Sequence, residues 1–438
     1  MAVGFEGPSA AGDGTGHPPG RPPVDKNGRS EVMANTSRRE HSGHVHLAVA
    51  LDGAGWHPAA WREPSARPRD LFTARYWVDL VHECEWGLLD FVTIEDSMGM
   101  QSSRRGILDD KTDQVRGRLD AVLTAARVAP STSAIGLVPV ATTTHTEPFH
   151  VSKSLATLDF VSRGRAGVQV RVSASELDAR QFGRRTLAES HSTSAVVSQN
   201  IDSVSDLFDE AADFVEVSRR LWDSWDDDAE IRDVATGRFV DRDRLHYIDF
   251  EGRWFSVKGP SITPRPPQGQ PVVTALAHVP VAFRLAARSA DAVFTTPTDA
   301  ASARDIVTTI RRHESDVSRL DPPLKIFADL VVFLDEDDEK AALRKDRLDE
   351  ALGRPFRSDA DVFVGTAGDL ADLMAEWQSA GIEGFRLRPG AIPHDIEAVT
   401  HDLVGVLQDR SRFRHHYEHS TLRARLGLSR PASRYAHT

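Results

Sequence analysis

The sequence predicts an α/β fold, a closed (β/α)8 barrel of the TIM type with insertions, and three observations favour it. Short apolar runs alternate with helical patterns of roughly 10–15 residues, which indicates repeated β–α units around a parallel sheet. Eight such runs stand out as strands, the number that closes this barrel. Apolar residues make up 40% of the 438 residues and charged residues 27%, enough to build one large core. A doubly wound open sheet is the alternative.

The predicted elements follow one another along most of the chain. Barrel strands are predicted at residues 45–51, 89–95, 135–142, 166–173, 271–276, 292–295, 324–334 and 384–387, where apolar runs lack helical spacing. Helices are predicted at 71–86, 115–127, 151–161, 206–225, 281–289, 300–312, 336–352, 370–380 and 394–407, and a short extra strand at 362–364. At least one helix separates each barrel strand from the next, as parallel strands require.

Segments outside this repeat divide the chain further. Residues 1–42 are rich in glycine and proline and lack apolar periodicity, so they are predicted as a disordered tail. The barrel is predicted to span 43–410, followed by a C-terminal extension at 411–438. Residues 174–203 are polar and aperiodic, and a loop of that length in a compact domain predicts a mobile lid. Residues 226–269 are predicted as an insertion that contains a β-hairpin.

The charge balance and the cysteine count narrow the function. Lys and Arg total 53 against 65 Asp and Glu, a formal charge of −12, so neither nucleic acid nor an anionic membrane is predicted as a partner. Cys84 is the single cysteine, which excludes an intramolecular disulfide and a cysteine-built metal site, and no metal centre is predicted. No apolar run reaches the ~20 residues of a membrane span. The first residues lack a signal-peptide pattern, so a cytoplasmic location is predicted.

Polar side chains follow the predicted strands at their carboxyl ends, where (β/α)8 barrels place their active sites. In chain order they are Trp56, His57, Glu95, Asp96, Ser97, Thr142, Thr143, Thr144, His145, Gln169, Arg171, Ser173 and His278. Each also has an ordinary structural explanation: Asp96 can cap the next element, the threonines suit a strand, and a lone histidine is more often structural. Their common position on one rim of the barrel favours a functional role.

Five stretches of sequence carry more specific motifs. They are ATTTHTEPFHVSKSLATLDFVSRGR at 141–165, DFVEVSRRLWDSW at 213–225, FEGRWFSVKGPSITPRPP at 250–267, FVGTAGDLADLMAEWQSAGIEGF at 363–385 and FRHHYEHSTLRARLGL at 413–428. Together they resemble the luciferase-like flavin-dependent monooxygenases, in particular the branch that contains nitrilotriacetate monooxygenase component A and dibenzothiophene sulfone monooxygenase. The likeness extends from about residue 44 to residue 430.

This resemblance implies a cofactor, partners and a reaction. The barrel is expected to bind reduced FMN (FMNH2) at the carboxyl ends of its strands and to oxygenate a small organic substrate with O2. A separate NAD(P)H-dependent flavin reductase is expected to supply the FMNH2. The family also implies a homo-oligomer, and closure of residues 174–203 over the site would exclude water.

The resemblance also assigns roles to individual residues. Asp96, Thr142, Thr143 and Gln169 fall at positions where the family contacts the flavin ring. His57 occupies the family's His-Pro turn after the first strand. With His145, which follows the threonines, it is predicted to make acid–base or polar contacts to the reacting oxygen or to the substrate.

The expected phosphate site departs from the family pattern. The family's His and Tyr ahead of the 213–225 motif are Val204 and Phe208 here, and its serine after the fifth strand is missing from 275–279. The residues that could replace these ligands are Arg184, Arg185, Ser203, Ser205 and His278, and His278 is predicted as a cofactor contact. Two alternatives stay open: a deazaflavin used for hydride transfer, or a degenerate, non-catalytic barrel.

Overall fold

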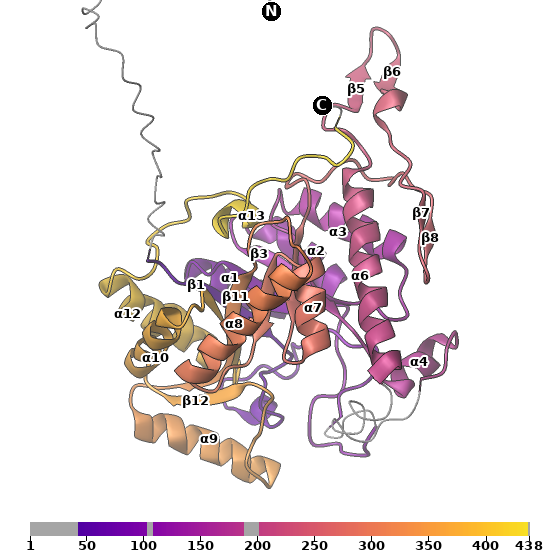
Figure 1. The fold of residues 1–438 in the computed structure, drawn as a ribbon. Coiled ribbons are helices and arrows are strands. Elements are labelled where there is room, and N and C mark those ends of the chain that lie inside the picture. Colours follow the sequence, from indigo (N-terminus) through magenta and orange to yellow (C-terminus); the bar gives the residue numbers. More distant parts are fainter. Residues whose placement is uncertain (1–42, 103–107, 188–200, 437–438) are drawn as a thin grey trace, which may run out of the picture. The chain divides into compact units, whose positions relative to one another are not determined.

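The structure is a computed structural model that describes residues 43–102, 108–187 and 201–436, so the predicted tail at 1–42 lies outside it. Nine parallel strands form the main sheet (Figure 1): β1 His46–Leu51, β2 Phe91–Ile94, β3 Gly136–Thr142, β4 Gly167–Arg171, β9 Val272–Leu276, β10 Ala292–Thr295, β11 Lys325–Leu334, β12 Asp361–Gly365 and β13 Gly384–Pro389. All but β12 form a ring, which β10–β11 and β13–β1 pairings close. The predicted (β/α)8 barrel is confirmed, and the alternative prediction of a doubly wound open sheet is wrong.

Helices connect the successive strands, and three more follow the last strand, β13. They are α1 Ala74–Trp86, α2 Ala121–Val128, α3 Pro148–Val161, α4 Glu176–Phe182, α6 Ile201–Asp223, α7 Pro280–Ser289, α8 Ala300–Asp316, α9 Asp338–Leu352, α10 Ala367–Ser379, α11 His394–Glu397, α12 Val404–Asp409 and α13 Leu422–Arg425. The prediction placed the start of α2 at residue 115. It begins at Ala121 because the Asp120 side chain accepts a hydrogen bond from Leu123 N at 2.7 Å and so caps the helix.

The predicted lid at 174–203 contains a helix that the sequence analysis missed. Ser175 caps α4 by accepting a hydrogen bond from Asp178 N, and Gly183 ends the helix in the left-handed conformation at φ 64°. A helix of seven residues is too short to show apolar periodicity, so its caps were the available signal. Residues 188–200 of the predicted lid lie outside the described part of the chain.

The predicted insertion at 226–269 contains two hairpins rather than one. β5 Glu230–Asp233 pairs with β6 Arg238–Val240, and β7 Phe250–Glu251 pairs with β8 Ser256–Val257. The second hairpin confirms the prediction, whereas the first one was missed. In Figure 1, β5 and β6 lie beyond the last turn of α6, whereas α4 lies beside its first turn. The first hairpin and α4 are therefore at opposite ends of α6, whereas the second hairpin lies alongside α6, where Arg253 pairs with Asp206.

None of the helices in the described ranges combines the length and apolar character that crossing a membrane requires.

The segment predicted as a C-terminal extension closes one end of the barrel. Leu422 and Leu426 are fully buried in the apolar cluster that includes Phe91, Phe294 and Phe327 from the barrel strands. The fit is close, since a Cβ atom added to Gly136 at the start of β3 would lie 2.7 Å from Leu422 Cδ1. These strand starts mark the amino end of the barrel, so the carboxyl end is the one left for a site.

Candidate functional site

A cavity of 460 Å³ lies at the carboxyl end of the barrel strands. Its walls come from three loops that follow β1, β2 and β4: residues 52–58 and 61, residues between 97 and 118, and residues between 175 and 181. The first loop supplies Trp56 and Trp61, and the third includes part of α4. The cavity thus lies where the predicted active-site rim and the predicted lid meet.

Arginines hold two residues that line this cavity, Asp52 and Trp56. Arg118 pairs with Asp52 through two hydrogen bonds, Nε to Oδ1 at 3.0 Å and Nη2 to Oδ2 at 2.6 Å. The guanidinium of Arg388, on β13, lies 4.5 Å from the centre of the Trp56 ring in a cation–π contact. The Trp56 indole also donates a hydrogen bond to Ala50 O at 3.2 Å, so its orientation is fixed from two directions.

His57 lines the cavity, but both of its ring nitrogens are engaged within the protein. Nδ1 accepts a hydrogen bond from Ala59 N at 3.0 Å, which leaves the proton on Nε2, 3.1 Å from Asp349 Oδ1. Burial lowers the pKa of His57 below its usual range, although Asp349 opposes that shift. These contacts support a role for His57 in holding the turn after β1.

His145 is in a different state. Its side chain is buried and stacks on Phe182 of α4, with ring centres 5.3 Å apart and planes 17° apart. Among the described residues, no group hydrogen-bonds to either ring nitrogen. Its backbone φ is 76°, a value that residues other than glycine rarely adopt. Residues with such a backbone conformation are often found at functional sites. Burial lowers its pKa, and the nearby Arg185 lowers it further.

The carboxylate of Asp96 is used by the backbone. Oδ1 accepts from Ser97 N at 2.6 Å and Oδ2 accepts from Ala121 N at 2.9 Å, at the start of α2. Burial raises the pKa of this carboxyl group, and the two backbone hydrogen bonds oppose the shift. Side chains alternate along a strand, so Thr93 and Glu95 point into the barrel while Asp96 points toward the helices. The contact of Asp96 with a flavin ring stays a prediction.

The other residues predicted to contact the ring surround the ends of β3 and β4. Thr142 is buried and aligned with Arg171 in the sheet register. Thr143 Oγ1 donates to Arg171 O at 3.1 Å, and Thr144 Oγ1 accepts from Ser173 N at 3.0 Å. These hydroxyls therefore join the two strand ends.

Inside the barrel, Gln169 belongs to a buried charged network that the sequence analysis did not find. Gln169 Oε1 accepts a hydrogen bond from Arg386, which also pairs with Asp329, as does Arg388. Arginines at positions 386 and 388, two residues apart on one strand, share a face and were a signal that could have been used.

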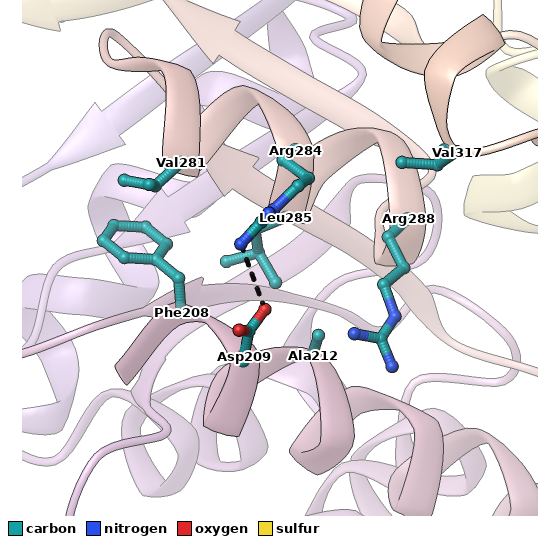
Figure 2. A pocket seen from close by; sticks show the side chains of 8 residues that line it. All are labelled: Phe208, Asp209, Ala212, Val281, Arg284, Leu285, Arg288 and Val317. Atoms are coloured by element: carbon teal, nitrogen blue, oxygen red, sulfur yellow. Dashed lines mark hydrogen bonds and ion pairs between the residues drawn. The ribbon is translucent and has the colours of Figure 1, made fainter. Parts of the chain in front are cut away.

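Two of the residues proposed to replace the phosphate ligands, Ser205 and His278, lie near the first turn of α6 and just ahead of α7. Arg284 of α7 donates to Ser205 Oγ at 3.1 Å and pairs with Asp209 at 3.3 Å, beside a pocket of 180 Å³ that Phe208 also lines (Figure 2). Arg185 forms two hydrogen bonds of 2.6 Å with the buried Glu210. His278 is exposed just ahead of α7.

Arg184 pairs with Glu147, and the side chain of Ser203 lies outside the described part of the structure. Arg184, Arg185 and Arg284 are therefore all paired with carboxylates, and Arg284, which was not predicted from the sequence, also lines the pocket between α6 and α7 (Figure 2).

A closed parallel barrel with a cavity and buried polar groups at its carboxyl end defines a barrel enzyme of the TIM type. The sequence model described as luciferase-like monooxygenase matches residues 54–347. The chain belongs to this family and is a flavin-dependent monooxygenase.

Two curated relatives and one solved structure are similar over most of the chain. N-acetyl-S-(2-succino)cysteine monooxygenase of Bacillus subtilis (strain 168) is 29% identical, over 90% of this chain and 98% of its own length. Nitrilotriacetate monooxygenase component A of Aminobacter aminovorans is 28% identical, over the same shares of each chain, 90% and 98%. The crystal structure of a long-chain alkane monooxygenase has a TM-score of 0.77 and 22% identity, over 88% of this chain and 95% of the other.

Proposed function

We propose that this chain binds reduced FMN at the carboxyl end of the barrel and oxygenates a small organic substrate in the adjoining cavity. The observation that carries the proposal is the state of His145. A buried imidazole whose ring nitrogens have no hydrogen-bonding group among the described residues is costly in a folded protein. A ligand that hydrogen-bonds to this ring would remove the cost.

The residues present fit a flavin. Glu95 Oε1 is a second buried polar atom with no hydrogen-bond donor in the described part of the chain, and Glu95 directly follows β2, the strand next to β3. A flavin ring has N–H and C=O groups along one edge that could satisfy such atoms. Thr142, Gln169 and His145 would hold the ring. Arg284, Ser205 and His278 are the candidates for the phosphate, beside the amino end of α7, which favours an anion.

The bound cofactor would supply the electrons that activate O2. The protein would orient the substrate against the ring and exclude water. Trp56 and Trp61 offer flat apolar walls, while Asp52 and Arg118 place a paired charge in the same cavity. Phe182 of α4 covers His145, and the bidentate Arg185–Glu210 pair connects the end of α4 to α6. Movement of α4 would therefore open or close access to His145.

The partners follow from the same proposal. An enzyme that uses reduced FMN as a substrate-like cofactor needs a second protein to reduce it, and we propose a separate NAD(P)H-dependent flavin reductase. One relative's name, component A, refers to a multicomponent monooxygenase. The cytoplasmic location and the homo-oligomer stay predictions.

The test is an anaerobic titration of the purified protein with FMN, FMNH2 and a reduced deazaflavin, followed by calorimetry. Binding of FMNH2 in the micromolar range supports the proposal, and preference for the deazaflavin would replace it with hydride transfer. Binding of none of the three would contradict the proposal.

A variant locates the site. His145→Asn keeps a side chain that tolerates positive φ but shortens its reach, and it should weaken FMNH2 binding by about threefold to tenfold, the value of one hydrogen bond. His401→Asn, at an exposed position on the outer helices, is the control and should bind FMNH2 as the wild type does.

A further inference from the structure

The barrel mouth holds an arginine and a glutamate that the function proposed above does not use together. Arg171, at the end of β4, donates from Nη2 to Glu95 Oε2 at 2.7 Å and from Nη1 to Asp96 O. Glu95 also lies 3.6 Å from Arg386 Nη1. Arg171 is thus held by two acceptors that directly follow β2, which β3 separates from β4 in the barrel.

Among the arginines of this charged network, Arg171 is the one whose guanidinium reaches the mouth of the barrel. Its side chain is 33% exposed, whereas those of Arg386 and Arg388 are 1% and 2% exposed. Asp329 pairs with both buried arginines, and Asp359 pairs with Arg388, so the charges deeper in the barrel are matched. The remaining N–H groups of Arg171 have no hydrogen-bond partner within residues 43–102, 108–187 and 201–436. They are free to contact a ligand.

The position of Arg171 relates it to the ring rather than to the phosphate. It is two residues beyond Gln169 on the same face of β4 and aligned with Thr142 of β3, and both of these are proposed ring contacts. A ring held by those two residues would lie against the Arg171 side chain. This inference therefore rests on the proposed function.

We infer that Arg171 stabilises the negative charge of the reduced flavin ring, with Glu95 as the positioning residue that holds its guanidinium. Reduced flavin is largely anionic near neutral pH, with the charge spread over N1 and the adjacent carbonyl oxygen, whereas the oxidised ring is neutral. A fixed guanidinium favours the anion because it carries a full charge and several N–H donors in one plane. Arg171 thereby makes the protein select the reduced cofactor.

The test measures the ratio of the dissociation constants for FMN and FMNH2, the second under anaerobic conditions. In Arg171→Met the affinity for FMNH2 should fall about tenfold to a hundredfold, the worth of a charge-assisted hydrogen bond, while the affinity for FMN changes by less than about threefold. Arg171→Lys keeps the charge and should retain most of the selectivity. Arg312→Met is the control, because Arg312 is exposed near the end of α8 that lies away from the mouth.

The possible outcomes of these titrations support or overturn the role of Arg171 as follows. Equal losses for FMN and FMNH2 in Arg171→Met would overturn it and leave the proposed function standing. If the wild type binds neither flavin, both fail together. Should Arg171→Met not fold, as judged by circular dichroism, the Arg171→Lys and Glu95→Gln variants carry the test. Glu95→Gln weakens the charged anchor of the guanidinium and should reduce the FMNH2 selectivity, whereas Arg171→Lys should retain most of it. Unchanged selectivity in Glu95→Gln would overturn the inference.

Discussion

Glu95 and Asp96 are neighbours in the sequence and have different surroundings because side chains alternate at the end of β2. Glu95 points into the barrel, toward Arg171 and Arg386. Asp96 points outward and accepts hydrogen bonds from two backbone N–H groups. Two adjacent carboxylates at a barrel mouth can therefore serve a ligand and the scaffold separately.

The position of Asp96 gives a prediction about stability. Asp96→Ala leaves Ser97 N and Ala121 N without their acceptor, which should lower the free energy of unfolding by about 1–3 kcal/mol. Urea denaturation measures this, with Asp305→Ala on the exposed face of α8 as the control. If Asp96→Ala unfolds like the wild type but no longer binds FMNH2, Asp96 is a ring ligand and its hydrogen bonds to the backbone are secondary.

The buried histidines give a prediction about pH. Burial lowers the pKa values of both His57 and His145, so the folded protein keeps them neutral at a pH where the unfolded chain takes up protons. The unfolded state then binds more protons, and stability falls as the pH drops below about 6.5. His145→Asn should lose less stability than the wild type between pH 7.5 and pH 5.5 in urea denaturation. An identical loss in both would show that His145 titrates normally.

At the scale of elements, the C-terminal segment belongs to the barrel core. Leu422→Ala would open a cavity against Gly136 and Phe91 and should cost about 2–5 kcal/mol of unfolding free energy. Leu343→Ala is the matched control, because that side chain is 59% exposed on α9. Thermal and urea denaturation both report the difference. Equal stability of the two variants would mean that the segment does not seal the barrel.

The elements that were predicted correctly are those whose own residues show a pattern typical of a strand or a helix. The eight barrel strands are short apolar runs, and α1, α3, α7 and α8 show apolar spacing within a single element. The start of α2 and the whole of α4 depend on capping by Asp120 and Ser175, which a search for periodicity overlooks. The packing of Leu422 against Gly136 joins residues far apart in sequence, so nothing local predicted it.

At the scale of the whole molecule, the sequence also predicted part of the site and missed the rest. The polar residues were found because they follow strands, and strand ends converge in a barrel. Their partners were not found, because hydrogen bonds such as that between His57, in the loop after β1, and Asp349, in α9, join residues almost 300 positions apart. Hence Asp96 and His57, which resemblance placed at the site, have both polar ends of their side chains engaged by the scaffold, while Arg171 and Glu95 have groups left for a ligand.

The central claim is that the barrel mouth binds reduced FMN and shields it from water. In the most direct measurement, the complex of the protein and FMNH2 is prepared without oxygen and then mixed with aerated buffer in a stopped-flow instrument. The absorbance of oxidised flavin is followed as it returns. A shielded site should delay that return relative to free FMNH2 at the same O2 concentration. His145→Asn should shorten the delay, because it weakens binding. Oxidation of FMNH2 at the same rate with and without the protein, at concentrations above those of the binding titration, would contradict the claim.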